Sequence, residues 1–368
     1  MFLSSAQIGA MPSLPVNARG RAARSNDSSR FDAFTRGEFD DGWTAEDGEP
    51  AQLETTLTAE KARVIISRND SPDIGFDRSI NPYRGCEHGC IYCFARPSHA
   101  YMGLSPGLDF ETKLFFKPEA AQLLERELSK RSYQPARIQL GANTDPYQPI
   151  ERKLQITREI LKVLARYKHP VGITTKNALV TRDIDILAPM AAERLAAVAV
   201  SVTSLDRKLA RAMEPRASTP ERRIDAIRQL SAAGIPTFIG FAPVIPGLND
   251  HEIEAVLERG AEVGAARAYY TMLRLPREIK DLFREWLEAE RPDRARRVMS
   301  LVRQTHRGKE YDPEWGKRMR GEGPVAELVA TRFRLAARKH GLDRPFPPME
   351  LGLFQRPAAD PNQLELFG

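Results

Sequence analysis

From about residue 63 to residue 272, short runs of apolar and β-branched residues alternate with longer segments whose apolar residues recur at helical spacing. A short apolar run between turn signals is typical of a buried strand, and apolar residues three and four positions apart indicate one face of a helix. Strands that alternate with helices, without hairpin signals between them, predict a parallel sheet of βα units. The expected strands are residues 137–141, 171–175, 196–202, 237–242 and 266–272.

Two helices in this region carry signals for their first residue. Thr219 suits the N-cap, Pro220 suits the first helical position, and Gly234 is placed to end the helix. Asn249, with Glu252 three residues later, has the spacing of a capping box. Both helices lead into an expected strand, which favours an α/β protein with an open or partial barrel. In such a barrel the active groups lie at the carboxyl ends of the strands.

The pattern changes on both sides of this region. Before it, the chain is rich in Ser, Gly, Asp and Arg and is expected to be largely disordered, with Trp43 as a candidate for docking on the body. After it, Arg-rich helical segments predict buried contacts from Leu328, Phe333 and Leu335. The expected regions are a disordered N-terminal region (1–60), a barrel core (61–275), a basic helical extension (276–345) and a Pro-rich tail (346–368).

Composition adds limits to this picture. The 368 residues are 42% hydrophobic with a mean hydropathy of −0.43, and no apolar run reaches the roughly 18 residues of a membrane span. The first residues lack the features of a secretory signal, so the expected location is the cytoplasm. The net charge is +6, and residues 274–344 hold 19 basic and 12 acidic residues. A basic face for a polyanion and an ordinary solvated helical surface both fit this excess.

All three cysteines of the chain, Cys86, Cys90 and Cys93, fall within eight residues. This distribution excludes a disulfide framework and favours thiolates that bind a metal. Iron–sulfur clusters normally take four cysteines, so three cysteines leave one iron without a protein thiolate. A zinc site with His88 or His99 as fourth ligand and a cluster that only transfers electrons are the alternatives.

The C-x3-C-x-aromatic-C pattern, with Tyr92 at the aromatic place, resembles the motif of the radical S-adenosylmethionine (SAM) superfamily. The resemblance implies a partial (β/α)6 TIM-like barrel, a 4Fe–4S cluster on the three cysteines, and SAM bound at the remaining iron, with Tyr92 among the cofactor contacts. It further implies reductive cleavage of SAM to a 5′-deoxyadenosyl radical, with an electron donor such as flavodoxin or ferredoxin. The cofactor supplies this chemistry and the protein positions it.

Residues 65–272 resemble the branch of the superfamily that contains spore photoproduct lyase, a DNA repair enzyme; with the DDGW segment and the tail, the chain is most similar to an uncharacterised bacterial family of that branch. By position in GANTDPYQPIE, the resemblance implies that Thr144 and Asp145 contact the cofactor amine. It likewise implies that Lys176 contacts the cofactor carboxylate, that Ser201 hydrogen-bonds the cofactor, and that Val244 lies near the adenine or ribose.

Two residues depart from the lyase pattern. Ala142 replaces the cysteine that donates hydrogen in the lyase, and Phe94 replaces a tyrosine that follows the last cluster cysteine. Repair of the spore lesion by the same route is therefore not expected. Tyr269 and Tyr270, at the end of the last expected strand, are candidates for hydrogen donation or for shaping the pocket, with buried packing as the alternative.

The last residues resemble the short peptide by which bacterial repair and replication proteins bind the sliding clamp. Closely spaced apolar anchors after a polar spacer can dock into a groove and become ordered on binding. The alternative is that these residues fold back onto the body of the protein. The residues concerned are Gln363, Leu364, Leu366 and Phe367.

The function expected from these features is radical SAM chemistry on an unknown substrate, with a DNA lesion as the first candidate. The basic extension, the kinship with the lyase and the terminal peptide all favour DNA as a partner. One alternative keeps the chemistry and changes the substrate to RNA, a peptide or a metabolite. The other is a non-catalytic iron–sulfur protein that binds DNA or the clamp.

Overall fold

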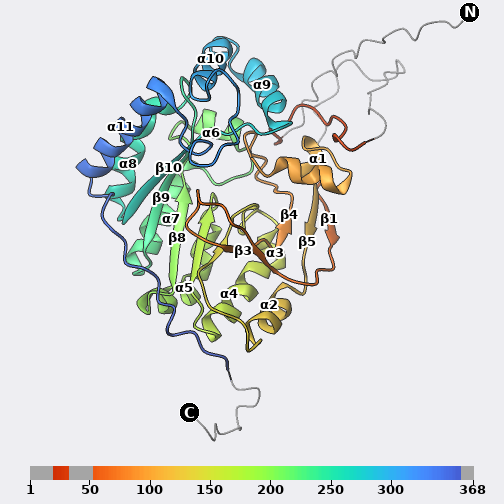
Figure 1. Cartoon of the computed structure of the whole chain (residues 1–368), viewed down its shortest axis with the longest axis vertical. Helices are drawn as coiled ribbons and strands as arrows, with labels where there is room; N and C mark the ends of the chain where they lie inside the picture. The colour runs from red at the N-terminus through yellow and green to blue at the C-terminus, as the bar shows by residue number, and fades with distance from the viewer. Residues whose placement is uncertain (1–19, 33–52, 358–368) are drawn as a thin grey trace, which may run out of the picture.

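The computed structural model describes residues 20–32 and 53–357. Its main sheet has seven strands in the order β10-β9-β8-β7-β6-β3-β2, of which all are parallel except β2, which is antiparallel to β3. The six parallel strands with their helices form the expected partial (β/α)6 barrel (Figure 1). All five predicted strands are present. The strands are β2 (Ile66–Arg68), β3 (Arg78–Ile80), β6 (Ile138–Leu140), β7 (Val171–Thr175), β8 (Ala196–Ser201), β9 (Thr237–Val244) and β10 (Arg267–Met272).

Helices cover the outer face of this sheet. Because side chains alternate along a strand, Val198 and Val200 of β8 pack into the main core, while Ala199 and Ser201 face the inside of the barrel. The polar residues on that inner face are the ones available for chemistry. The covering helices are α2 (Ala120–Leu128), α3 (Glu151–Leu154), α4 (Ile156–Arg166), α5 (Ile184–Ala192), α7 (Pro220–Ala232) and α8 (Ile253–Glu262), with short 3-10 helices at Ala178–Asp183 and Asp250–Glu252.

The two helix-start predictions have different outcomes. The Thr219 hydroxyl accepts a hydrogen bond from the Arg222 N–H at the start of α7, so this N-cap is confirmed. The capping box at Asn249 is wrong. The Asn249 side chain bonds the backbone of Thr203, Pro243 and Ile245, because it closes the turn after β9 instead of capping α8.

The C-terminal helices pack at two places on the barrel, beside the cysteine loop and beside the edge strand β10. α9 (Ile279–Glu290) and α10 (Ala295–Gln304) share a second core with the cysteine loop, and α11 (Gly323–Lys339) covers β10. Phe333 is buried as predicted, but Leu328 and Leu335 are 59% and 57% exposed. Those two predictions were wrong because Leu328 and Leu335 lie on the outer side of α11. None of the helices in the described ranges combines the length and the apolar composition that a membrane crossing requires.

Two parts of the N-terminal region lie on the body of the protein, which the sequence pattern did not predict. β1 (Thr56–Ala59) pairs with β5 (Lys113–Phe116), and β5 pairs with β4 (Tyr83–Arg84), in a small sheet beside the barrel. Residues 20–32 pack beside α1 (Leu108–Thr112), where Ala22 and Ala23 are buried. Trp43 lies outside the described residues.

The open side of the barrel is crossed by two loops. Residues 69–77 connect β2 to β3, and residues 312–322 are the second part of the connection from α10 to α11, which spans residues 305–322. In the second loop the Met319 carbonyl accepts from Met272 on β10, while Gly316 and Arg318 bond the carboxylate of Asp73 in the first. The loops therefore link the two edges of the sheet.

Candidate active site

The three cysteines lie on one loop between β4 and the 3-10 helix Arg96–Met102. Cys86 and Cys90 are buried and Cys93 is half-buried, and all three are free thiols. Gly89 has a φ of 66°, and a Cβ there would lie 2.7 Å from the carboxylate of Glu111. The loop can wrap this tightly only with glycine at that position.

The arrangement of the thiols fits a cluster better than a single ion. No group of three or more His, Cys, Asp or Glu in the part of the chain that the structure describes could hold one metal ion. Both histidines proposed as zinc ligands have other partners, since His88 contacts Asp145 and Asn177 and His99 contacts the Lys113 carbonyl. Burial raises the pKa of Cys86 and Cys90 well above the usual value, so their thiolates need a cation. In an iron–sulfur cluster each thiolate binds a different iron, so the thiols need not surround one ion and each buried thiolate still has a cation.

A buried ion pair between Arg96 and Glu111 supports the cysteine loop. Arg96 is fully buried, and its guanidinium donates to the carbonyls of Gly89 and Cys90 and, at 2.5 Å, to the carboxylate of Glu111. The same carboxylate accepts the N–H groups of Ala22 and Ala23. A charged fork that holds two loop carbonyls fixes the path of the backbone between the cysteines.

A second buried network ties the loop to the sheet. The Tyr92 hydroxyl donates to Glu214, which also accepts from Thr203 and pairs with Arg223. Arg223 in turn donates to the carbonyl of Ser201. Burial raises the pKa of Glu214 even though Arg223 opposes this effect. Tyr92 therefore acts in the structure as a link between the cysteine loop and β8.

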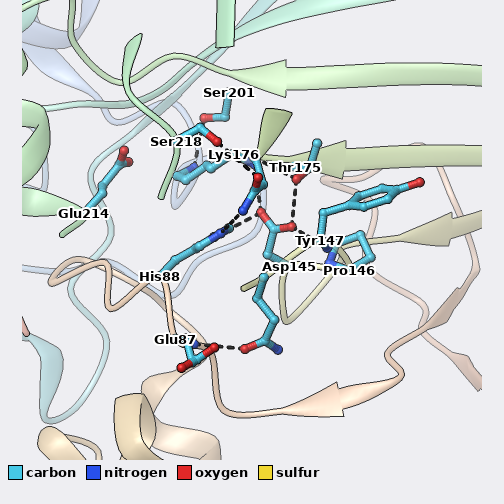
Figure 2. Close-up of polar contacts among 12 residues, drawn as sticks. Glu87, His88, Asp145, Pro146, Tyr147, Thr175, Lys176, Ser201, Glu214 and Ser218 are labelled. Atoms are coloured by element: carbon cyan, nitrogen blue, oxygen red, sulfur yellow. Dashed lines mark hydrogen bonds and ion pairs between the residues drawn. The ribbon is translucent and has the colours of Figure 1, made fainter. Parts of the chain in front are cut away.

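Asp145 is the centre of the polar contacts in Figure 2. Its carboxylate accepts from the backbone N–H groups of Tyr147 and Lys176 and from the Thr175 hydroxyl, and His88 Nδ1 lies 3.3 Å away. Burial would raise the pKa of Asp145, but His88 and these donors outweigh it and lower the pKa. Asp145 thus joins β7 to the cysteine loop.

Lys176 and Ser201 lie together inside the barrel. Lys176 Nζ is 2.9 Å from Ser201 Oγ and 3.4 Å from the Ala242 carbonyl, which also accepts from Ser201. The ammonium lies 5.8 Å from the Tyr92 ring centroid, and burial lowers the pKa of Lys176. An ammonium has three N–H donors, so these two contacts leave one for an anionic ligand.

The other residues predicted to bind the cofactor do not join the cluster of Asp145, Lys176 and Ser201. The Thr144 hydroxyl donates to the Tyr83 carbonyl just before the cysteine loop. Val244 is fully buried in the core and its carbonyl accepts from Leu273, and a place near the adenine or ribose stays a prediction for this residue. The terminal peptide at 363–367 lies outside the described residues.

Tyr269 and Tyr270 point to opposite faces of β10, because neighbouring side chains on a strand alternate. The Tyr269 ring lies over Gly240 on the inside of the barrel, and burial raises the pKa of Tyr269 to about 12. The Tyr270 ring packs on Phe333 of α11, with centroids 4.7 Å apart. Tyr270 therefore packs on the outer face of β10, which fits the alternative of buried packing for this residue.

Several residues of the site were missed by sequence reasoning. Glu111, Glu214 and Arg223 were not among the expected site residues, because their positions depend on how loops pack and not on local spacing. His88 entered only as a zinc ligand, although its position inside the cysteine loop was a signal. Arg216 pairs with Glu87 of the cysteine loop at 3.1 Å.

A partial barrel of six parallel strands, with a three-cysteine loop after the first strand and polar residues at the carboxyl ends of the next ones, defines the radical SAM class of enzymes. The model of the Radical SAM superfamily matches residues 80–260. An uncharacterized protein of Mycobacterium tuberculosis is 36% identical over 275 residues, which cover 74% of this chain and 78% of the relative. The chain belongs to the radical SAM superfamily and is a radical SAM enzyme.

Other similarities extend this result. An uncharacterized protein of Methanocaldococcus jannaschii is 29% identical over 192 residues, 52% of this chain and 69% of the relative. Among solved structures, spore photoproduct lyase complexed with a dinucleoside spore photoproduct has a TM-score of 0.55 at 16% identity, over 77% of this chain and 79% of the lyase. A lyase variant with bound AdoMet and the same ligand has a TM-score of 0.54. These two structures show that the fold is like that of the lyase.

Proposed function

We propose that this enzyme cleaves SAM reductively at a 4Fe–4S cluster bound by Cys86, Cys90 and Cys93, and that the radical acts on a nucleic-acid substrate such as a DNA lesion. The observation that carries the first part is the set of three free thiols, two buried and one half-buried, on one tightly held loop, in a chain without a fourth cysteine. The cluster, when bound with SAM, supplies electron transfer to the sulfonium and hence a 5′-deoxyadenosyl radical.

The residues of the chain hold and orient these groups. Arg96 fixes the loop carbonyls, and the network of Tyr92, Glu214 and Arg223 fixes the loop relative to β8. Lys176 offers an N–H to the cofactor carboxylate, with Ser201 beside it. The Asp145 carboxylate already has four contacts, so its main part is to orient His88 and the backbone of Lys176. Thr144 holds the backbone ahead of the loop.

Return of hydrogen to the substrate needs a donor other than the lyase cysteine, because Ala142 stands there. Tyr269 is our candidate, since its ring lies on the inner face of the barrel beside Gly240 and its hydroxyl is within reach of Thr174. Transfer of the O–H hydrogen atom to the substrate radical breaks the O–H bond, forms a C–H bond and leaves a tyrosyl radical. One electron from the reduced flavodoxin or ferredoxin and one proton from solvent then restore the phenol. Tyr269→Phe is expected to stop product formation while 5′-deoxyadenosine still forms.

A nucleic-acid substrate is supported by three features. The excess of basic residues lies in residues 274–344, the fold is like that of an enzyme solved with a dinucleoside photoproduct, and the terminal peptide resembles a clamp-binding segment. We propose the bacterial sliding clamp as a partner through Gln363, Leu364, Leu366 and Phe367, and flavodoxin or ferredoxin as the electron donor. Clamp capture that is unchanged by combined Leu366→Ala and Phe367→Ala would exclude the first of these partners.

The function is tested by anaerobic reconstitution with iron, sulfide, reductant and SAM, followed by measurement of 5′-deoxyadenosine with and without ultraviolet-damaged DNA. Wild type is expected to form 5′-deoxyadenosine, Cys90→Ala is expected to form none, and damaged DNA is expected to increase the yield. Absence of the product in a preparation with full iron content would instead indicate a non-catalytic iron–sulfur protein. Stimulation by RNA or by a peptide, without stimulation by DNA, would reassign the substrate.

A further inference from the structure

A guanidinium covers an aromatic ring next to the last cluster cysteine. Phe94 directly follows Cys93 and is 43% exposed. Arg274, two residues after the end of β10, places its guanidinium carbon 4.8 Å from the centroid of the Phe94 ring. The pair therefore joins the cysteine loop to the last strand of the barrel, at the end where the polar residues of the site lie.

The guanidinium N–H donors of Arg274 find few hydrogen-bond acceptors in the protein. Its Nε is buried without a hydrogen-bond partner, and Nη1 is 3.2 Å from the sulfur of Met319, which is a weak acceptor. Within the described residues no carboxylate forms an ion pair with Arg274. Asp73 feels its charge at longer range, but the Asp73 carboxylate is bonded by Gly316 and Arg318. A buried guanidinium donor without a partner is costly, and an anionic ligand would satisfy it.

We propose that Arg274 and Phe94 form a substrate-binding site for a phosphate group beside an unstacked base. This inference rests on the proposed function and specifies its substrate. The guanidinium presents a planar fork of N–H donors that suits a phosphate. The exposed part of the Phe94 ring offers a stacking surface, and stacking on an aromatic side chain contributes about 1–3 kcal/mol per base in single-strand binding.

The surroundings favour a nucleic-acid strand over a small carboxylate. A small carboxylate ligand would contact only the Arg274 guanidinium and would leave the exposed part of the Phe94 ring without a contact. The loops at 69–77 and 312–322 cross the open side of the barrel, so an unstacked base reaches the site more easily than an intact duplex. Single-stranded DNA is therefore expected to bind more tightly than duplex DNA of the same sequence.

The test uses full-length, anaerobically reconstituted protein and a fluorescent single-stranded oligothymidylate, with binding followed by anisotropy at fixed salt. Arg274→Gln is expected to weaken binding about tenfold or more, Arg274→Lys to recover part of the loss, and Phe94→Leu to weaken binding severalfold. Arg166→Gln is the matched control. The Arg166 guanidinium carbon lies 5.8 Å from the centroid of the Tyr167 ring, but at the end of α4 and outside residues 274–344, so its loss is expected to change binding less than twofold.

Equal affinity of Arg274→Gln and wild type, or an equal loss in Arg166→Gln, would overturn the proposal. Competition with unlabelled compounds identifies the ligand. Displacement of the probe by thymidine monophosphate indicates that a free nucleotide is enough, and displacement by unlabelled oligonucleotide alone indicates that a strand is needed; both support phosphate recognition. Displacement by malate alone contradicts phosphate recognition. Iron content and melting temperature are measured for each variant, and Arg274→Lys decides the question if Arg274→Gln folds poorly. Formation of 5′-deoxyadenosine by wild type without oligonucleotide tests the proposed function separately.

Discussion

Lys176 holds a positive charge inside the barrel against two neutral oxygens, those of Ser201 and Ala242. Removal of this charge by Lys176→Met is expected to weaken SAM binding at least tenfold, because a hydrogen bond to a charged group is worth about 1.5–3 kcal/mol. The measurement is titration of SAM against the reconstituted enzyme, followed by the electron paramagnetic resonance signal of the reduced cluster. Lys208→Met, at an exposed position on α6 (Arg207–Met213), is the matched control. Unchanged SAM affinity in Lys176→Met would remove this residue from the site.

His169 makes stability depend on pH at a distance from the cysteines. It is fully buried between the Tyr133 hydroxyl and the Pro170 carbonyl, and burial lowers its pKa from 6.5 to about 4. The unfolded chain therefore takes up the proton first, and this contribution to stability is present above pH 6.5 and is lost as the pH falls toward 4. The whole difference is at most about 3 kcal/mol.

The expected result is a free energy of unfolding that falls between pH 7.5 and 5.5, with a shallower fall in His169→Gln. Denaturant unfolding of both proteins over this range measures the difference. His251→Gln, at an exposed position, is expected to leave the pH dependence of wild type in place. Identical slopes for wild type and His169→Gln would contradict this account.

The resemblance to the lyase branch named Asp145, Lys176 and Ser201, and the structure places them after or at the end of adjacent parallel strands. For Tyr269 and Tyr270 the sequence left the face of the strand open, because a shift of one residue along a strand moves a side chain to the opposite face. The partners of Glu111 and Arg223 depend on how loops pack in three dimensions, and no local spacing reveals that.

At the scale of elements, the segment of residues 20–32 acts as a brace for the cysteine loop. Two of its N–H groups bond the carboxylate of Glu111, which pairs with Arg96 beneath the cysteines. Its other side bonds α9, through Arg24 to Glu290 and Ser25 to Glu285. The segment was expected to lack structure because its composition is polar, but its contacts are hydrogen bonds and ion pairs, which apolar periodicity does not report.

Deletion of residues 1–32 is expected to reduce the iron and sulfide that reconstituted protein retains, because the buried Glu111 carboxylate loses the two N–H donors that fix it beside Arg96. Deletion of residues 1–19 alone keeps these contacts and is the control. Iron and sulfide content together with melting temperature measures the effect. Full cluster content in the longer deletion would show that Arg96 and Glu111 hold the loop without the brace.

For the whole molecule, the link between Asp73 and Arg318 joins the two edges of an open sheet. Arg318 donates to Asp73 and, at 2.6 Å, to Ser71, while Gly316 N–H donates to Asp73. Arg318→Gln is expected to loosen this link and to increase amide hydrogen exchange in residues 69–77 and 312–320, with little change in α4 or α7. Exchange mass spectrometry measures this, with the exposed ion-pair variant Arg228→Gln as control. Unchanged exchange in both loops would show that the link does not hold them closed.

The contacts of the brace also impose an order on biogenesis. Residues 24, 25 and 30 leave the ribosome early, but their partners Glu278, Glu285 and Glu290 are 248 to 266 positions later in the chain. Docking of the brace on α9 cannot be completed until α9 has been synthesised. Its bonds to Glu111 span only 88 and 89 positions, so the side of the brace that faces the cysteine loop can form long before the side that faces α9.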